Sequence, residues 1–150
     1  MKKRSENQIF LVSIDYFYEF FMKWYLKVMK QYADFGGRAR RKEFWMFLLF
    51  NVIFLYLAMI IDSVLGITVG EDFSYGWFFL FYCLSTFLPG LAVQVRRLHD
   101  VGKSGWNLFL ALIPLVGIII QIIWFLTDSH AGENKWGSNP KEQLEQKEHG

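Results

Sequence analysis

The chain has 150 residues, of which 53% are apolar and 19% aromatic, and its formal net charge is only +2. A soluble domain of this length buries about two-thirds of its surface and keeps a largely polar exterior. Here the charged residues cluster near the two ends and in two internal loops, and three long intervals between them hold no Asp, Glu, Lys or Arg. This distribution excludes a disordered chain, a disulfide scaffold and a coiled coil, and it indicates a small integral membrane protein.

The first predicted element is an amphipathic helix over residues 9–33, within an N-terminal extension that covers residues 1–33. Its charged side chains fall within an arc of about 120° on a helical wheel, at Asp15, Glu19, Lys23, Lys27 and Lys30. Because these charges are costly in hydrocarbon, the helix is expected to lie in the interface plane, and packing against the membrane helices is the alternative. A cleaved secretion signal is not expected, because Asp15 interrupts the apolar run and no small-residue cleavage site follows.

Three uncharged intervals follow, at about residues 44–61, 75–95 and 106–127. As a helix, the first of them reaches roughly 27 Å, close to the thickness of the hydrocarbon core. Pro89 and Pro114 are expected to kink the second and third helices rather than end them, since neighbouring groups in a membrane bundle satisfy the freed carbonyls. The predicted fold class is an all-α integral membrane protein, with three transmembrane helices preceded by an amphipathic interfacial helix.

The loops between the predicted spans differ in charge. Residues 36–43 and 96–105 are both basic, whereas residues 62–74 carry three acids and no base. The positive-inside rule puts the two basic loops and the N-terminus in the cytoplasm, and three spans then put the C-terminal tail outside. A re-entrant hairpin that turns at residues 114–117 is the alternative, and it would return the tail to the cytoplasm.

Four strings of the sequence carry a family resemblance. They are YADFGGRARRKEFWMFLLFN (32–51), LAVQVRRLHDVGKSGW (91–106), IPLVGIIIQIIWF (113–125) and GENKWGSNP (132–140). They are similar to the DUF805 family of small bacterial inner-membrane proteins, whose signature Arg-Arg-Leu-His-Asp-x-Gly-Lys-Ser-Gly-Trp matches throughout. The resemblance implies residence in the bacterial inner membrane, where the three predicted spans would make the protein multi-pass, and it supplies no activity. We expect a membrane domain over residues 34–140 and a charged, flexible tail over residues 141–150.

The signature string places several chemical groups at the end of a membrane helix. Arg96, Arg97 and Lys103 are candidates for binding an anion, together with backbone amides of the glycine-rich stretch. A phosphate-binding loop is not expected, because Leu98 stands where the first glycine of that motif belongs. The simpler interpretation is a cytoplasmic turn whose charges set the topology, with Asp100 paired to a nearby base.

His99, Asp100 and Ser104 form the polar loop in which any further function would reside. Sequence neighbours such as His99 and Asp100 do not by themselves form a hydrogen-bonded catalytic pair, so we expect no enzyme here. No Cys/His cluster has metal-ligand spacing, and neither basic loop belongs to a recognised nucleic-acid-binding fold. Metal, cofactor and nucleic acid are therefore not expected.

The predicted function is that of a non-catalytic membrane module. Its expected partners are the bilayer, anionic lipid head groups, and a second copy or another membrane protein. The head groups would contact the basic loops, at Arg38, Arg40, Arg41, Arg96, Arg97 and Lys103. The alternative is a small membrane enzyme or transport subunit that acts on a phosphate-bearing lipid or an exported solute.

Overall fold

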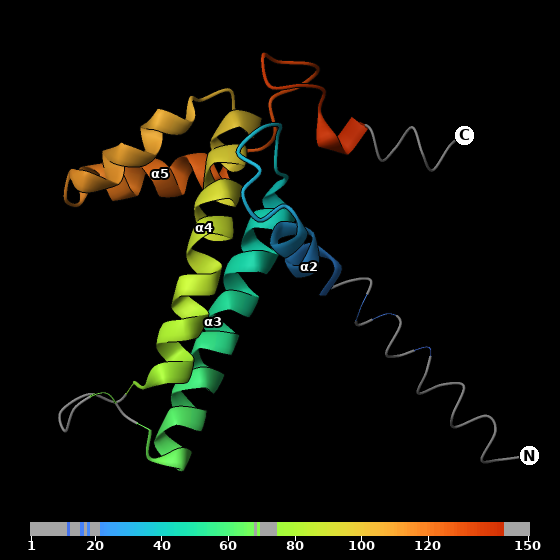
Figure 1. The fold of residues 1–150 in the computed structure, drawn as a ribbon. Coiled ribbons are helices and arrows are strands. Elements are labelled where there is room, and N and C mark those ends of the chain that lie inside the picture. Colours follow the sequence, from blue (N-terminus) through green and yellow to red (C-terminus); the bar gives the residue numbers. More distant parts are fainter. Residues whose placement is uncertain are drawn as a thin grey trace, which may run out of the picture.

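The computed structural model describes residues 22–67, 69 and 75–142, together with the isolated positions 12, 16 and 18. Its named elements are all helical: α2 (Lys23–Lys30), α3 (Arg41–Leu65), α4 (Trp77–Asp100), the 3₁₀ helix η2 (Gly105–Leu112) and α5 (Val116–Leu126). Helices α3 and α4 run side by side in opposite directions, and η2 and α5 lie across the upper end of α4 (Figure 1). The described residues therefore form an antiparallel helical pair with its additional elements at one end.

Helices α3 and α4 contain the first two predicted spans. They have 25 and 24 residues, and both are long and apolar enough to cross a membrane. Large apolar side chains remain exposed along them, among them Leu57, Leu84 and Phe87, as expected for helices surrounded by lipid. Pro89 lies inside α4, and the helix continues through it as expected. The structure thus supports two membrane-crossing helices.

Asp62 joins the lower ends of these two helices. The sequence groups it with the acidic loop 62–74, but it lies in the last turns of α3 and is fully buried. Its carboxylate accepts hydrogen bonds from the backbone amides of Gly76, Phe78 and Phe79, at 3.0, 3.1 and 2.9 Å. These amides belong to the start of α4 and have no partner within that helix, so Asp62 acts as its N-terminal cap.

The third predicted span is wrong as a single helix. Over residues 106–127 the chain forms η2, a turn, and α5, which packs back against η2. Pro114 cannot donate to a preceding carbonyl, and the next residue, Leu115, has φ 62° and ψ −64°. The amide of Val116 then donates to the carbonyl of Pro114 at 2.7 Å, which closes a γ-turn. The path is therefore the hairpin that the sequence left as the alternative.

Two residues hold this hairpin closed. A Cβ atom on Gly117 would lie 1.7 Å from the carbonyl oxygen of Leu110, so only glycine allows η2 and α5 to approach this closely. The side-chain amide of Gln121 donates to the carbonyls of Asn107 and Leu108, at 3.2 and 2.6 Å. These contacts satisfy backbone groups of η2 on an otherwise apolar element.

Helix α2 is the described part of the predicted amphipathic helix, and most of residues 9–21 lie outside the described residues. Its Tyr25 is buried, stacks on Phe47 with ring centroids 5.5 Å apart, and shares a hydrogen bond of 2.9 Å with the hydroxyl of Tyr82. Tyr82 in turn donates to Asn51 at 3.1 Å. Residues 23–30 therefore use their aromatic face to pack on the helical pair.

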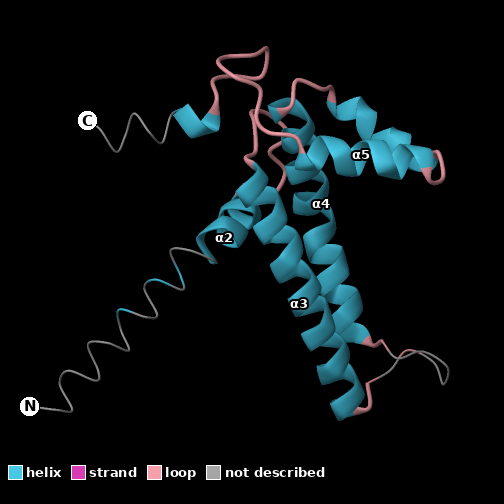
Figure 2. Ribbon diagram, turned by 180° about the vertical axis from the view of Figure 1, so that it is seen from behind, coloured by secondary structure: helices cyan, strands magenta, loops and turns pink. Residues whose placement is uncertain are grey.

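The buried core lies where α2, α3, α4 and α5 meet. It is built by Tyr25, Val28, Ala39, Phe44, Phe47, Phe50, Val93, Leu98 and Phe125. The loops 31–40, 101–104 and 127–139 gather at this same end of the molecule, which we call the headpiece (Figure 2). The last turn of α3 and the first turn of α4 lie at the opposite end (Figure 2).

Candidate functional site

The signature residues at the end of α4 are buried inside the headpiece. Arg96, Arg97 and Asp100 are at most 1% exposed, and His99 is 8% exposed. The charged part of the predicted turn is therefore the last turn of a helix that is covered on several sides. In the signature, exposure to solvent begins only at Gly102 and Lys103.

Asp100 lies between two guanidinium groups. Its Oδ1 accepts from Nε of Arg38 at 3.1 Å, and its Oδ2 accepts from Nη1 of Arg97. The hydroxyl of Ser129 also donates to Oδ2, at 2.6 Å. A buried carboxylate requires this degree of pairing, because an unpaired charge in the interior is strongly unfavourable. The predicted pairing of Asp100 with a nearby base is confirmed.

The remaining donors of Arg38 hold the C-terminal segment. Its Nη1 donates to the carbonyls of Gly132 and Gly137, at 2.8 and 3.1 Å, and its Nη2 donates to the carbonyl of His130 at 2.6 Å. The backbone amide of His130 donates to the carbonyl of Asp100 at 2.9 Å, which adds a second link to the end of α4. The loop before α3 is thereby tied to residues that follow α5 by way of one arginine.

Arg97 and Arg41 bind the end of α5. Arg97 donates to the carbonyls of Phe125 and Thr127, and Arg41 donates to the carbonyl of Leu126 at 3.0 Å. The last carbonyls of a helix lack partners within it and carry partial negative charge, so two guanidinium groups stabilise this terminus. We refer to Arg38, Arg97 and Asp100 as the clamp.

A second buried carboxylate, Glu43, holds the N-terminal side of the headpiece. It accepts from Nη2 of Arg96 at 3.4 Å and pairs with the ammonium group of Lys27. Arg96 also donates to the carbonyls of Gln31 and Asp34. These contacts join α2, the loop after it, the first turn of α3 and the end of α4. Both partners of Glu43 lie outside the loop 36–43, so no local sequence pattern indicates them.

His99 and Asp100 do not form a catalytic pair. The ring of His99 stacks on Trp136, with centroids 4.4 Å apart and planes 12° apart. Its Nδ1 lies 3.1 Å from the carbonyl oxygen of Gly37, and because a carbonyl only accepts, Nδ1 carries the proton. The carboxylate of Asp100 is occupied by arginines and Ser129 instead. Trp136 is a further residue of this site that the sequence did not indicate.

The six bases predicted to bind lipid fall into two groups. Arg38, Arg96 and Arg97 are buried and bind the chain itself, so they are not available to a head group. Arg40 is half-buried near the ring of Trp24, and Arg41 is exposed beside Asp128 at 3.4 Å. Lys103 is exposed and lies over Trp124, 5.5 Å from the ring centroid.

Asp128 is the acidic residue of the exposed rim. It accepts from the ammonium group of Lys141, and this hydrogen bond holds the pKa of the Asp128 carboxyl below its usual value. Ser104, the third residue of the predicted polar loop, is half-buried at the start of η2. Within the part of the chain that the structure describes, no group of three or more His, Cys, Asp or Glu could hold a metal ion.

Comparison with known proteins assigns the chain to a family. The model of the family described as protein of unknown function (DUF805) matches residues 32–138. The Escherichia coli K12 inner membrane protein YhaH is 46% identical over 121 residues, which cover 80% of this chain and 98% of that protein. The inner membrane protein YhaI of the same strain is 41% identical over 120 residues, covering 80% of this chain and 97% of its own length.

No solved structure matches the chain. The family match spans both sides of the headpiece, from the loop before α3 to the residues that bind Arg38. The match covers most of the chain, and it confirms the resemblance predicted from the signature string. The chain belongs to the DUF805 family of membrane proteins.

Proposed function

We propose that this protein is a non-catalytic module of the bacterial inner membrane, whose headpiece contacts anionic lipid head groups. The observation that carries the proposal is that some basic residues are buried and bind the chain itself, whereas others are exposed. The clamp and Arg96 use their charges internally, whereas other bases stay exposed around the same end of the molecule. We call Lys30, Arg41, Lys42 and Lys103 the basic rim.

The proposed topology has two spans and one hairpin. Helices α3 and α4 cross the bilayer, and the positive-inside rule assigns the headpiece, and with it both chain ends, to the cytoplasmic side. Helix α5 has 11 residues, about 16 Å in length, which is too short to cross. Because η2 and α5 expose Trp106, Phe109, Ile119 and Ile123, we propose that the hairpin enters the cytoplasmic leaflet without crossing it.

The surroundings of the basic rim suit a lipid interface. Each base near an anionic leaflet gains about 1 kcal/mol of attraction. Lys103 lies over Trp124, and the ammonium of Lys42 lies 5.8 Å from the ring centroid of Trp24. Tryptophan favours the head-group level of a bilayer, so these pairs would hold the two charges there. The part of α2 that the structure describes adds Lys30 to the same rim.

The enzyme and transport alternatives receive less support from this geometry. His99 and Asp100 face different partners, and the arginines that would bind a phosphate group are occupied by carboxylates and backbone carbonyls. A transport path is normally marked by ionisable groups inside the spans. Within the described apolar parts of α3 and α4, the one acid, Asp62, is used to cap α4.

The test measures the lipid preference of the full-length protein. The protein is exchanged into detergent micelles holding equal phosphatidylglycerol and phosphatidylcholine, and the retained lipids are quantified by mass spectrometry at low and high salt. We expect phosphatidylglycerol to be enriched at low salt and less so at high salt. A variant with Lys30→Gln, Lys42→Gln and Lys103→Gln should lose most of this enrichment.

The matched control replaces the same three lysines by arginine, which keeps the charge. It should retain the enrichment of the unmodified protein. If the glutamine and arginine variants retain the same lipids in the same ratio, the basic rim does not bind anionic lipid and the proposal is overturned.

A further inference from the structure

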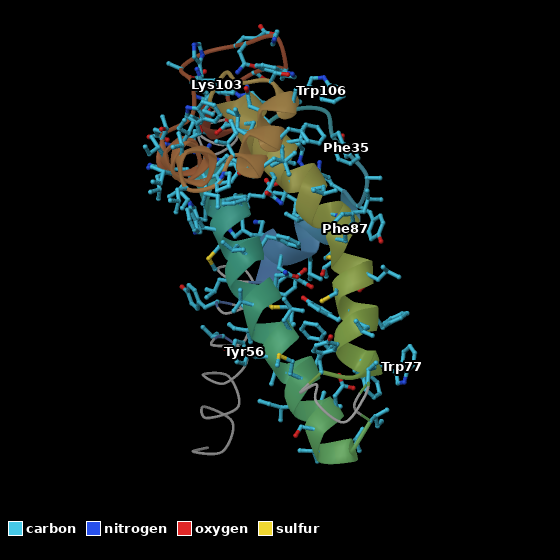
Figure 3. The ribbon with its side chains drawn as sticks, turned by 90° about the vertical axis from the view of Figure 1, so that its left-hand side faces the viewer. Phe35, Tyr56, Trp77, Phe87, Lys103 and Trp106 are labelled. Atoms are coloured by element: carbon cyan, nitrogen blue, oxygen red, sulfur yellow. The ribbon has the colours of Figure 1, made fainter. Side chains whose placement is uncertain are left out.

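A groove of about 750 Å³ runs beside α4 and ends in the headpiece. Its walls come from α4, from η2 and from the C-terminal segment, at Phe87, Leu91, Val95, Trp106, Phe109 and Trp136. Figure 3 shows Phe87 and Trp106 projecting on the same side of the molecule as Phe35, which also lines the groove. The described residues of its wall include no Asp, Glu, Lys or Arg.

The headpiece end of this groove is polar. His99 and Ser104 both line it, and they belong to the loop that the sequence singled out. In the neutral ring, donation from Nδ1 of His99 to the carbonyl of Gly37 leaves the other ring nitrogen, Nε2, with a lone pair and no proton. Within the described part of the chain, Nε2 makes no hydrogen bond. An acceptor on a side chain that is more than nine-tenths buried therefore faces an apolar groove.

Gly105 keeps the space in front of this nitrogen open. A Cβ atom at Gly105 would lie 3.5 Å from Nε2 of His99 and 2.7 Å from Cγ1 of Val95. Any larger residue would therefore fill the polar end of the groove. The stacking of His99 on Trp136 also fixes the ring, so the acceptor has one orientation.

We propose that this groove binds one apolar chain of a neutral lipid, and that a hydroxyl group on the lipid donates a hydrogen bond to Nε2 of His99. The groove follows α4 from Phe87 to His99, about 18 Å along the helix axis, which matches an extended lipid chain. The wall offers an acceptor and a serine hydroxyl but no cation, so it suits an alcohol better than a phosphate or a carboxylate. Its apolar length would open to the bilayer, the source of such a lipid.

This proposal does not depend on the basic rim. Residues of the basic rim do not line the groove, and a neutral head group carries no charge that would pair with them. A negative result in the anionic-lipid test would therefore not count against the groove. A negative result for the groove would likewise not count against the basic rim.

The experiment uses photolabelling of the full-length protein in neutral phosphatidylcholine nanodiscs. Three probes carry the same 16-carbon chain and the same diazirine, and they end in a hydroxyl, a carboxylate or a methyl group. Labelled peptides are located by mass spectrometry. We expect the alcohol to label residues 87–109 about fivefold more than the methyl-terminated probe, the ratio given by one hydrogen bond.

Two variants close the groove at its two ends. Gly105→Ala fills the polar end and Leu91→Trp fills the apolar part, and each should reduce labelling by the alcohol to the level of the methyl-terminated probe. Tyr56→Trp is the control, because Tyr56 is exposed on α3 and lies on the other side of the helical pair (Figure 3). Thermal melting of each variant checks that it is folded, and two independent blocking variants allow for the failure of one.

Three results would overturn the proposal. Equal labelling by the alcohol and the methyl-terminated probe would mean ordinary contact with bilayer lipid. Preferential labelling by the carboxylate would mean a charged ligand. If a second copy or another segment of this chain covers the groove, labelling in the unmodified protein will be no higher than in Gly105→Ala.

Discussion

Arg38 and Asp100 are 62 positions apart in the sequence, yet Nε of the arginine lies 3.1 Å from the carboxylate, and both side chains are at most 1% exposed. This pair connects the loop that precedes α3 with the end of α4. Because Arg38 also binds three carbonyls of the C-terminal segment, the same pair connects three parts of the headpiece. The clamp is therefore the main polar link of this end of the molecule.

Asp100→Asn should destabilise the headpiece strongly. The substitution leaves two buried guanidinium groups without a counter-charge, and breaking one side of a buried ion pair costs about 3–5 kcal/mol. Thermal unfolding of the purified protein, followed by tryptophan fluorescence, measures the effect. Asp128→Asn is the control: Asp128 pairs with Arg41 and Lys141 on the surface, where a pair contributes about 0–1 kcal/mol. Equal losses of stability would show that burial of the clamp is unimportant.

Asp62→Ala should destabilise the other end of the helical pair. It removes the acceptor for three amides at the start of α4, and loss of a helix cap costs about 1–2 kcal/mol. Ser63→Ala, at the exposed neighbouring position, should have little effect. Both are compared by thermal unfolding in the same detergent. A Ser63 variant as unstable as the Asp62 variant would contradict the role of Asp62 as a cap.

Gly117→Ala and Gly90→Ala should differ in their effect on the melting temperature. A Cβ at Gly117 would lie 1.7 Å from the Leu110 carbonyl oxygen, so η2 and α5 must move apart. A Cβ at Gly90 would meet its nearest neighbour, Cε1 of Phe47, at an ordinary 3.8 Å, and alanine is a better helix former than glycine by about 1 kcal/mol. We expect a lower melting temperature for the first variant and an unchanged or higher one for the second. Similar behaviour of the two would contradict the close approach in the hairpin.

The two-span topology is tested with single cysteines. The one native cysteine, Cys83, is first replaced by alanine, and Lys103→Cys, Lys135→Cys or Val64→Cys is then introduced. Two spans and a hairpin predict that positions 103 and 135 react with a membrane-impermeant maleimide from the cytoplasmic side, and that position 64 reacts from the other side. Labelling of position 135 from the same side as position 64 would instead support three spans.

Hydropathy predicts α3 and α4 well because a membrane helix requires a long uncharged run, which can be seen directly in the sequence. Their ends are predicted less well. Helix α3 continues to Leu65, past Asp62, because the start of α4 supplies three amides to that carboxylate. Hydropathy does not predict this contact, because the amides that bind Asp62 come from a later helix.

The third apolar interval shows a different limit. A run of 22 uncharged residues fits either one long helix or two short ones, and composition does not separate them. The decision depends on local features: Pro114, the positive φ of Leu115, and the fit of Gly117 against Leu110. The proline and the glycine were visible in the sequence, but the close contact that makes the glycine necessary was not.

The sequence drew attention to the residues at the end of α4, but it did not predict that the arginines there are buried. Arg97 and Asp100 are three residues apart on a helix, so their pairing was predictable from the sequence. From the sequence, Arg38 and Arg96 were expected to lie on the surface. Their main partners are 53 or more residues away, and no local sequence pattern shows that those segments come close. Burial of a charge is a property of the assembled structure.

The contacts of Arg38 and Arg97 with residues 125–137 also set an order of assembly. During synthesis, α3 and α4 leave the ribosome before the carbonyls that complete the clamp exist. Until then the two guanidinium groups must stay in contact with water, because burial without those acceptors is costly. The headpiece therefore closes last, and a nascent chain halted before residue 125 would expose its arginines at the membrane surface.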